Sequence, residues 1–185
     1  VVYCDSNLGV GGASIFGFKK AIKEGFDILF KIDGDGQHDP KYIVKFKDVF
    51  ENEHINFCKG SRFLIPEEEK KIPKIRYIGN KILTYITKKI CKIDNLTDAV
   101  NGYLAIKSEL LKKIDLDQVS FDYFFEEDLL FKLSFHDIKI KEIPIETIYF
   151  ENRSSLNPFL VILPFLIKHF KNFIFRLKYE FSRKK

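Results

Sequence analysis

Two aspartates, Asp33 and Asp35, stand two residues apart directly after a short apolar run, residues 26–32. Such a run is typical of a buried strand in a parallel sheet, and open α/β sheets bind ligands at the carboxyl ends of their strands. Two carboxylates beside glycines concentrate negative charge around one point. Hard divalent cations such as Mg²⁺ and Mn²⁺ prefer oxygen ligands of this kind, often shared with substrate phosphates. The pair therefore predicts a cation site at the edge of a sheet.

The acidic stretch is open to four interpretations, of which a calcium loop is the first. That loop requires glycine at its sixth position and glutamate at its twelfth, and counting from Asp33 these positions hold His38 and Val44. The calcium interpretation therefore fails. A phosphohydrolase with an aspartyl nucleophile, a metal–diphosphate site of a nucleotide-sugar transferase and a solvated acidic turn all remain.

Asp39-Pro40 is typical of a helix start, because aspartate is a good N-cap and proline is favoured at the first helical position. We expect a helix over residues 40–52, with Ile43, Val44, Phe46, Val49 and Phe50 as its buried stripe. Asp39 is accordingly expected to cap this helix and not to bind a metal.

Polar residues at other element ends could face the same ligand. The glycine-rich stretch from Asn7 to Gly12 lacks the lysine of a phosphate-binding loop and fits a dinucleotide fingerprint imperfectly, so it predicts a tight turn. Arg62 follows a predicted strand, and its forked donors suit a diphosphate. Asp128 opens a predicted helix, where acids are favoured by the helix dipole, and a general base is the functional alternative.

The hydrophobic pattern predicts an α/β domain in which strands and helices alternate. The expected strands are residues 1–5, 26–32, 55–59 and 104–106, with two more in residues 138–148. The expected helices are residues 13–24, 40–52, 74–93 and 126–136. Residues 66–73, rich in charge and bounded by prolines, predict a mobile surface loop or lid.

The predicted helix over residues 74–93 carries isoleucines at helical spacing, at positions 75, 78, 82, 86, 90 and 93. This single apolar face most simply packs on the helix's own domain. Because lysines occupy the remaining surface, a helix lying on anionic lipid is the alternative interpretation.

Composition bounds the class of protein. A chain of 185 residues with 45% hydrophobic residues and 20 Phe can form one substantial core. Three scattered cysteines are compatible with the cytosol, and a chain without Met that opens in an apolar run indicates a fragment whose preceding strand or strands are missing. Residues 159–185 carry a net charge of +6 in a chain of net +5, so the basic excess lies in the tail and argues against nucleic-acid binding by the core.

Over residues 1–158 the chain resembles the family 2 glycosyltransferases of the GT-A fold, closest to the polyprenyl-phosphate sugar transferases typified by dolichyl-phosphate mannosyltransferase. The strongest motif is Asp33-Gly34-Asp35-Gly36-Gln37-His38-Asp39-Pro40. The resemblance implies that Asn7, Gly9, Asp33 and Asp35 bind the nucleotide-sugar donor. It also implies that Asp35 and Gln37 hold Mg²⁺ or Mn²⁺ on the donor diphosphate.

The same resemblance extends to three catalytic candidates. Gly60-Ser61-Arg62 matches the family's basic strand end, Asp128 occupies its acidic position near the acceptor, and Arg153 is the cation of its late loop. The chain departs from the family where the base-recognising first strand is expected, so a UDP-sugar and a GDP-sugar both remain open as donor. The expected organisation is a GT-A domain over residues 1–157 followed by a basic, aromatic-rich segment over residues 158–185.

The implied function is metal-dependent, inverting transfer of a sugar from a nucleotide-diphosphate sugar to a polyprenyl phosphate. Such an enzyme would work at the cytoplasmic face of a membrane. The nine apolar residues before the basic tail, 159–167, are too short to span a bilayer, which takes about 20 residues. We expect an interfacial segment or a lead-in to membrane helices, and a C-terminal helix that docks on the core is the alternative. A soluble family 2 transferase acting on a sugar hydroxyl in polysaccharide synthesis is the alternative, and an Asp-x-Asp phosphohydrolase is a remote one.

Overall fold

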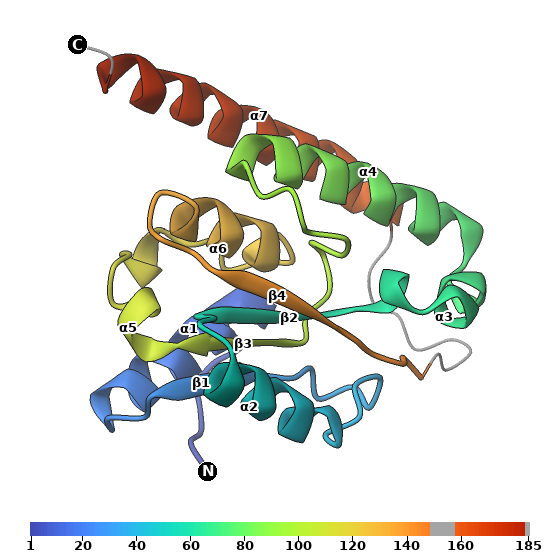
Figure 1. The fold of residues 1–185 in the computed structure, drawn as a ribbon. Helices are drawn as coiled ribbons and strands as arrows, with labels where there is room; N and C mark the ends of the chain where they lie inside the picture. Colours follow the sequence, from blue (N-terminus) through green and yellow to red (C-terminus); the bar gives the residue numbers. More distant parts are fainter. Residues whose placement is uncertain (149–157, 184–185) are drawn as a thin grey trace.

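The computed structural model describes residues 1–148 and 158–183, which form a four-stranded sheet flanked by helices (Figure 1). The strands are β1 (Ile28–Lys31), β2 (Phe57–Ser61), β3 (Leu104–Lys107) and β4 (Ile140–Pro144), in the order β1-β3-β2-β4. Strand β3 is antiparallel to both β1 and β2, whereas β2 and β4 are parallel. The predicted mixed α/β sheet is confirmed. The prediction that the strand before Asp33 belongs to a parallel array is wrong, because its partner among the described strands is the antiparallel β3.

Helices cover both faces of this sheet (Figure 1). One face is covered by α1 (Gly9–Lys23), α4 (Lys74–Cys91), α5 (Ser108–Leu111) and α6 (Phe125–Leu133), and α7 (Pro158–Ser182) packs beside α4. The other face is covered by α2 (Tyr42–Asn52). Residues of β3 alternate between the two cores: Leu104 and Ile106 join the first, and Ala105 joins the second.

The amino-terminal residues differ from the prediction. Residues 1–5 form no strand and are exposed, because no neighbouring strand among the described residues pairs with them. The predicted glycine turn is instead the first turn of α1, which begins at Gly9. The N–H groups of Gly11 and Gly12 both donate to the Phe121 carbonyl, at 2.9 and 3.1 Å. A side chain on Gly11 would collide with the backbone of residues 120–121, so this close approach requires glycine.

The charged loop predicted over residues 66–73 is also wrong. It contains the short helix α3 (Pro66–Lys71), which starts at proline and has glutamates in its first turn. Glu68 is buried and accepts a hydrogen bond from the Thr147 N–H at 3.0 Å. Thr147 forms an isolated bridge with His38, so residues 138–148 contribute one strand and this bridge, not two strands.

Two predicted helix faces are only partly buried. On α2, Tyr42, Phe46 and Phe50 form the buried stripe, and Val44, predicted to be buried, is 64% exposed. Helix α4 ends at Cys91, followed by Lys92 in the left-handed conformation at φ 58°. Its isoleucines are buried only near that end, and the prediction of one continuous buried face is wrong for its first half.

Candidate functional site

The acidic loop, residues 33–38, follows β1 directly. Asp35 is exposed, and its Oδ1 accepts a hydrogen bond from the Gln37 N–H at 3.0 Å. Asp39 Oδ1 accepts from the Lys41 N–H at 2.9 Å, in the turn ahead of α2. Helix α2 begins at Tyr42 with Lys41 at its N-cap position and no side-chain cap, so the prediction that Asp39 caps this helix is wrong. Asp35 and Asp39 therefore have different structural settings within one loop.

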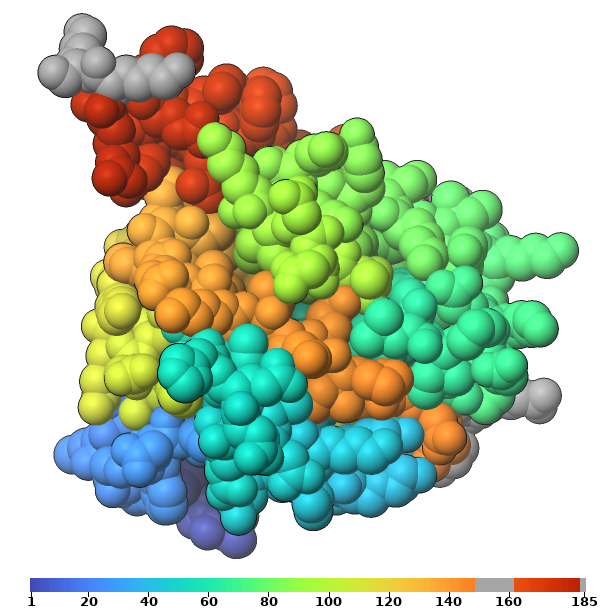
Figure 2. Space-filling view, in the orientation of Figure 1, coloured from blue at the N-terminus to red at the C-terminus, as the bar shows by residue number. Residues whose placement is uncertain are grey.

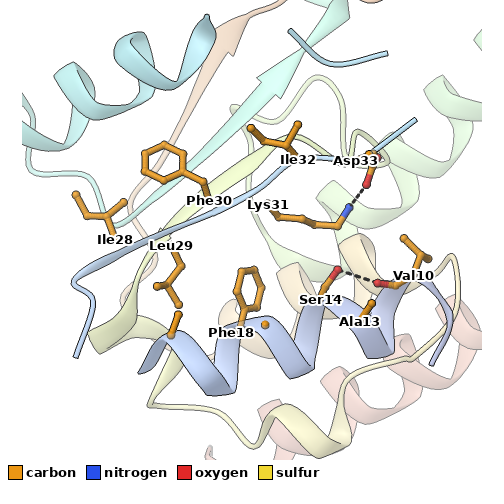
Figure 3. Close-up of a pocket in the computed structure, with 13 residues that line it drawn as sticks. Val10, Ala13, Ser14, Phe18, Ile28, Leu29, Phe30, Lys31, Ile32 and Asp33 are labelled. Atoms are coloured by element: carbon orange, nitrogen blue, oxygen red, sulfur yellow. Dashed lines mark hydrogen bonds and ion pairs between the residues drawn. The ribbon is translucent and has the colours of Figure 1, made fainter. Parts of the chain in front are cut away.

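Asp33 is held by a buried lysine at the end of β1. Lys31 Nζ donates to Asp33 Oδ1 at 2.7 Å and to Glu126 Oε1 of α6 at 2.7 Å. It also donates to the Gly102 carbonyl at 3.3 Å. Figure 3 shows Lys31 and Asp33 joined at one end of the groove between α1 and β1. This arrangement directs Asp33 toward the start of β3.

The pKa values of Lys31 and Asp33 keep both side chains charged. Burial lowers the pKa of Lys31, but the Glu126 and Asp33 carboxylates outweigh burial and the net shift is upward. Burial raises the pKa of Asp33, but the Lys31 ammonium outweighs it and the net shift is downward. Lys31 and Asp33 are thus an ion pair at neutral pH.

Gly102 makes room for this ion pair. A methyl group on Gly102 would lie 2.9 Å from both Asp33 Cγ and Lys31 Nζ, and closer still to Asp33 Oδ2. A second buried lysine, Lys59 of β2, donates to the carbonyl of Asn101. Lysines from the two strands that flank β3 therefore hold two consecutive carbonyls of the turn that leads into it.

His38 connects the acidic loop to the second core. The Asp33 N–H donates to His38 Nδ1 at 3.4 Å, and the His38 ring lies 5.2 Å from the Tyr103 ring. Burial lowers the pKa of His38, and the charges of Asp33, Lys31, Asp35 and Arg62 also act on it. His38 thus contacts Asp33 directly and lies in the same loop as Asp35.

Arg62 reaches this region from the end of β2. Its Nε and Nη2 donate to the two carboxylate oxygens of Asp98 at 2.8 and 2.9 Å. The Glu142 carboxylate accepts from the backbone N–H groups of Thr97 and Asp98, at 2.8 and 2.9 Å, and so holds this turn in place. A bidentate pair of this kind fixes the plane of the guanidinium group.

The oxygen donors at the acidic loop fit a divalent cation that is shared with a ligand. Within residues 1–148 and 158–183, no group of three or more His, Cys, Asp or Glu side chains could hold a metal unaided. An exposed carboxylate and a side-chain amide, as on Asp35 and Gln37, are hard oxygen donors. Mg²⁺ or Mn²⁺ held here would take its remaining ligands from water and phosphate, as these ions commonly do.

The model of the family described as "Glycosyl transferase family 2" matches residues 1–115. The chain belongs to this family.

Curated relatives carry names that agree with this membership. The UDP-N-acetylglucosamine–dolichyl-phosphate N-acetylglucosaminyltransferase of Methanococcus voltae is 35% identical over 147 residues, which are 80% of this chain and 58% of the relative. The undecaprenyl-phosphate mannosyltransferase of Micrococcus luteus is 30% identical over 141 residues, 74% of this chain and 56% of the relative. The chain thus spans less than two thirds of the length of these relatives.

Solved structures support the GT-A fold. The glucosyl-3-phosphoglycerate synthase of Mycobacterium tuberculosis, bound to phosphoglyceric acid, matches with a TM-score of 0.54 and 15% identity, over 95% of this chain and 56% of that one. The same enzyme with Mn²⁺, uridine diphosphate and glucosyl-3-phosphoglycerate matches with a TM-score of 0.54, 14% identity, and coverage of 91% and 55%. At this identity the likeness concerns the fold alone.

In this family 2 glycosyltransferase, the predicted donor residues Asn7 and Gly9 line a groove with residues 121–123. Asn7 Oδ1 accepts from the Gly9 N–H at 2.9 Å. Val10 borders both this groove and the α1–β1 groove that ends at Asp33 (Figure 3). The small residues Ala13, Gly17 and Ala21 of α1 line the α1–β1 groove.

The Asp128 carboxylate makes hydrogen bonds that were not predicted from the sequence. Its carboxylate accepts from the Ser120 N–H at 2.8 Å and from Asn172 Nδ2 of α7 at 3.2 Å, and its side chain is buried. Glu126, which was not singled out, is the carboxylate of α6 that bonds the Lys31–Asp33 pair. Sequence spacing alone could not distinguish these acids, because both lie in the first turn of α6. Arg153 lies outside the described residues.

The buried carboxyl group of Glu127 in α6 should make the stability of the fold depend on pH. Burial, and then the charge of Glu126, raise its pKa from 4.5 to about 8, and neither of its carboxylate oxygens has a hydrogen-bond partner among the described residues. Because the folded state binds the proton more tightly, the stability that Glu127 contributes is present below the unfolded pKa of 4.5 and is lost as pH rises toward about 8.

We therefore expect the melting temperature of Glu127→Gln to increase relative to that of the wild type as pH rises from about 5 to about 9. Thermal unfolding across this range measures the difference. Glu109→Gln, at an exposed position, is the matched control. A melting-temperature difference between Glu127→Gln and the wild type that does not change with pH would contradict the raised pKa of Glu127.

Proposed function

We propose that this protein is a metal-dependent, inverting glycosyltransferase that moves a sugar from a UDP- or GDP-sugar to a polyprenyl phosphate. The observation that carries the proposal is the acidic loop, where Lys31 fixes Asp33 and leaves Asp35 exposed beside Gln37. Support comes from curated relatives whose names include dolichyl-phosphate and undecaprenyl-phosphate transferases. Asn7, Gly9, Asp33 and Asp35 would bind the donor.

The residues of the site would act mainly through charge. Asp35 and Gln37 would hold Mg²⁺ or Mn²⁺, which when bound supplies positive charge to the departing diphosphate. Arg62, oriented by Asp98, would add a fixed cation on the same side, and Arg153 is proposed as a second cation. Preorganised charge of this kind is usually the largest contribution to catalysis.

The environment of Asp128 favours a phosphate acceptor over a sugar hydroxyl. A hydroxyl acceptor benefits from a general base, whereas a phosphate is already anionic. Asp128 is buried and its carboxylate accepts hydrogen bonds from Ser120 and Asn172, and we infer a structural role for it from these contacts. Because polyprenyl phosphates reside in bilayers, transfer would take place at a membrane surface, for which we propose the cytoplasmic face. None of the helices in residues 1–148 and 158–183 has an apolar stretch that could cross a bilayer.

A transfer assay tests this proposal. The protein is incubated with Mn²⁺, a radiolabelled UDP- or GDP-sugar, and a polyprenyl phosphate in detergent. We expect label to enter the organic phase, and to stop entering it when EDTA removes the metal. Transfer only to a glycoside hydroxyl, or release of phosphate from simple phosphomonoesters instead of transfer, would contradict the proposal.

A further inference from the structure

Glu126 is a buried carboxylate that is linked to the acidic loop through Lys31. It lies in the first turn of α6 and is 6% exposed. Its Oε1 accepts from Lys31 Nζ at 2.7 Å, and the same ammonium donates to Asp33 Oδ1 at 2.7 Å. One lysine therefore joins two carboxylates that come from distant parts of the chain.

The three side chains have a closed end and an open end. Those of Lys31 and Glu126 are each 7% exposed, whereas that of Asp33 is 32% exposed. Lys31 Nζ also lies 6.0 Å from the centroid of the Phe125 ring, which adjoins Glu126 in α6. Asp33 is therefore the member of this group that a ligand can reach, and Glu126 is the member on the closed side.

The position of Glu126 at a helix start does not by itself account for the pair. An acid in the first turn is favoured by the helix dipole whether or not it is buried beside a lysine. A buried ion pair is often no more stabilising than apolar side chains of the same size, so stability is a weak explanation as well. The contact of Glu126 with Lys31 is better explained by where it holds the ammonium group.

The charge balance shows what Glu126 adds. Because two carboxylates share one ammonium, the three side chains together carry one negative charge. If Glu126 were neutral, Asp33 would be the one charged group among the described residues that bonds to Lys31. The Asp33 carboxylate would then be drawn toward Lys31 and neutralised by it. It would be a weaker acceptor for the hydroxyl or N–H groups of a ligand.

Helix α6 is suited to anchor such a contact. It packs on both α1 and α4, and its Asp128 carboxylate is bonded to Ser120 and Asn172. Figure 2 shows the orange segment that contains α6 bordered by the green, yellow and teal segments of the fold. Glu126 thus extends from an element whose own position is fixed by packing on several sides.

We propose that Glu126 is a positioning residue of the donor site, which holds the Lys31 ammonium on α6 and thereby sets the place and the charge of the Asp33 carboxylate. The proposal rests on the proposed function for the identity of the ligand, a nucleoside diphosphate with its sugar. Glu126 does not contact the donor itself, and its effect passes through Lys31 and Asp33.

Binding of a nucleoside diphosphate tests this role without requiring transfer. UDP and GDP are titrated into the protein by calorimetry, with Mn²⁺ present and near neutral pH. We expect Glu126→Gln to bind the nucleotide that the wild type prefers about tenfold more weakly. In transfer assays the KM for the nucleotide sugar should rise by a similar factor, while kcat stays within about twofold.

Glu127→Gln is the matched control, because it makes the same chemical change at the next buried position of α6. Burial raises the pKa of Glu127 to about 8, so its carboxyl group is protonated near neutral pH and the amide matches it in charge. Neither of its carboxylate oxygens has a hydrogen-bond partner in the described part of the chain. This variant should bind nucleotide as the wild type does.

A second variant guards against loss of folding in Glu126→Gln. Lys31→Met/Glu126→Leu replaces the buried pair with apolar side chains of similar size, an exchange that often preserves stability. It should melt near the wild-type temperature and still bind nucleotide weakly, because Asp33 has lost the lysine that places it. Wild-type affinity in this stable variant would contradict a positioning role.

A double-mutant cycle shows whether Glu126 acts through Asp33. In the Asp33→Asn background, Glu126→Gln should cause no further loss of affinity, whereas a general structural role would give losses that add. Wild-type affinity in Glu126→Gln, an equal loss in Glu127→Gln, or additive losses in the cycle would overturn the proposal and leave the proposed function standing. Failure of the wild type to bind either nucleotide with Mn²⁺ would refute the proposed function, and this role of Glu126 with it.

Discussion

Replacing Asp35 with alanine is expected to reduce sugar transfer on the order of a thousandfold, because the departing diphosphate loses the carboxylate that holds its cation. Asp35 is exposed and bonds only within its own loop, to the Gln37 N–H, among the contacts described for it. The fold should therefore tolerate the change. Steady-state transfer rates measured against Mn²⁺ concentration give the effect.

Asp39→Ala is the matched control for this prediction. Asp39 lies in the same acidic stretch, but its carboxylate accepts from the Lys41 N–H ahead of α2. We expect this variant to keep its transfer rate within a few fold and to lose only a little thermal stability. Equal losses of activity in the two variants would show that Asp35 has no special role.

Gly102→Ala is expected to have the second largest effect, a loss of transfer on the order of a hundredfold. The added methyl group would lie 2.9 Å from Asp33 Cγ and from Lys31 Nζ, so the ion pair must move. Both groups are the far ends of side chains, and the protein should still fold. The predicted result is a displaced Asp33, with a higher KM for the nucleotide sugar and little change in melting temperature.

Gly79→Ala controls for the added methyl group. No atom lies within 4 Å of the corresponding position on Gly79 in α4, and alanine favours a helix over glycine by about 1 kcal/mol. We expect full activity and a slightly higher melting temperature. Retention of full activity by Gly102→Ala would contradict the role assigned to the Lys31–Asp33 pair.

Much of the site could be predicted from local sequence. The acidic stretch after an apolar strand, the helix following Asp39-Pro40 and the strand leading to Arg62 depend on short-range patterns, and each element is present. The family membership implied by these motifs is confirmed by the match over residues 1–115. The roles of individual site residues stay predictions.

The remaining features depend on contacts between distant residues. Nothing in the sequence around Lys31 indicates that it pairs with Glu126, which lies 95 positions away. The need for glycine at position 102 arises only because Asp33 reaches it from the acidic loop after β1. Periodicity identified the apolar face of α4, but the direction in which that face points is set by polar inner contacts such as that of Thr84 with the Ala99 N–H.

The most direct test is a crystal structure of the protein with Mn²⁺ and a nucleoside diphosphate, with data collected to locate manganese by anomalous scattering. We expect one manganese peak bound by Asp35 and Gln37 and bridged to the diphosphate, with Asp33 still paired to Lys31. A diphosphate bound elsewhere, or no manganese at the acidic loop when the nucleotide is bound, would contradict the assignment of this site.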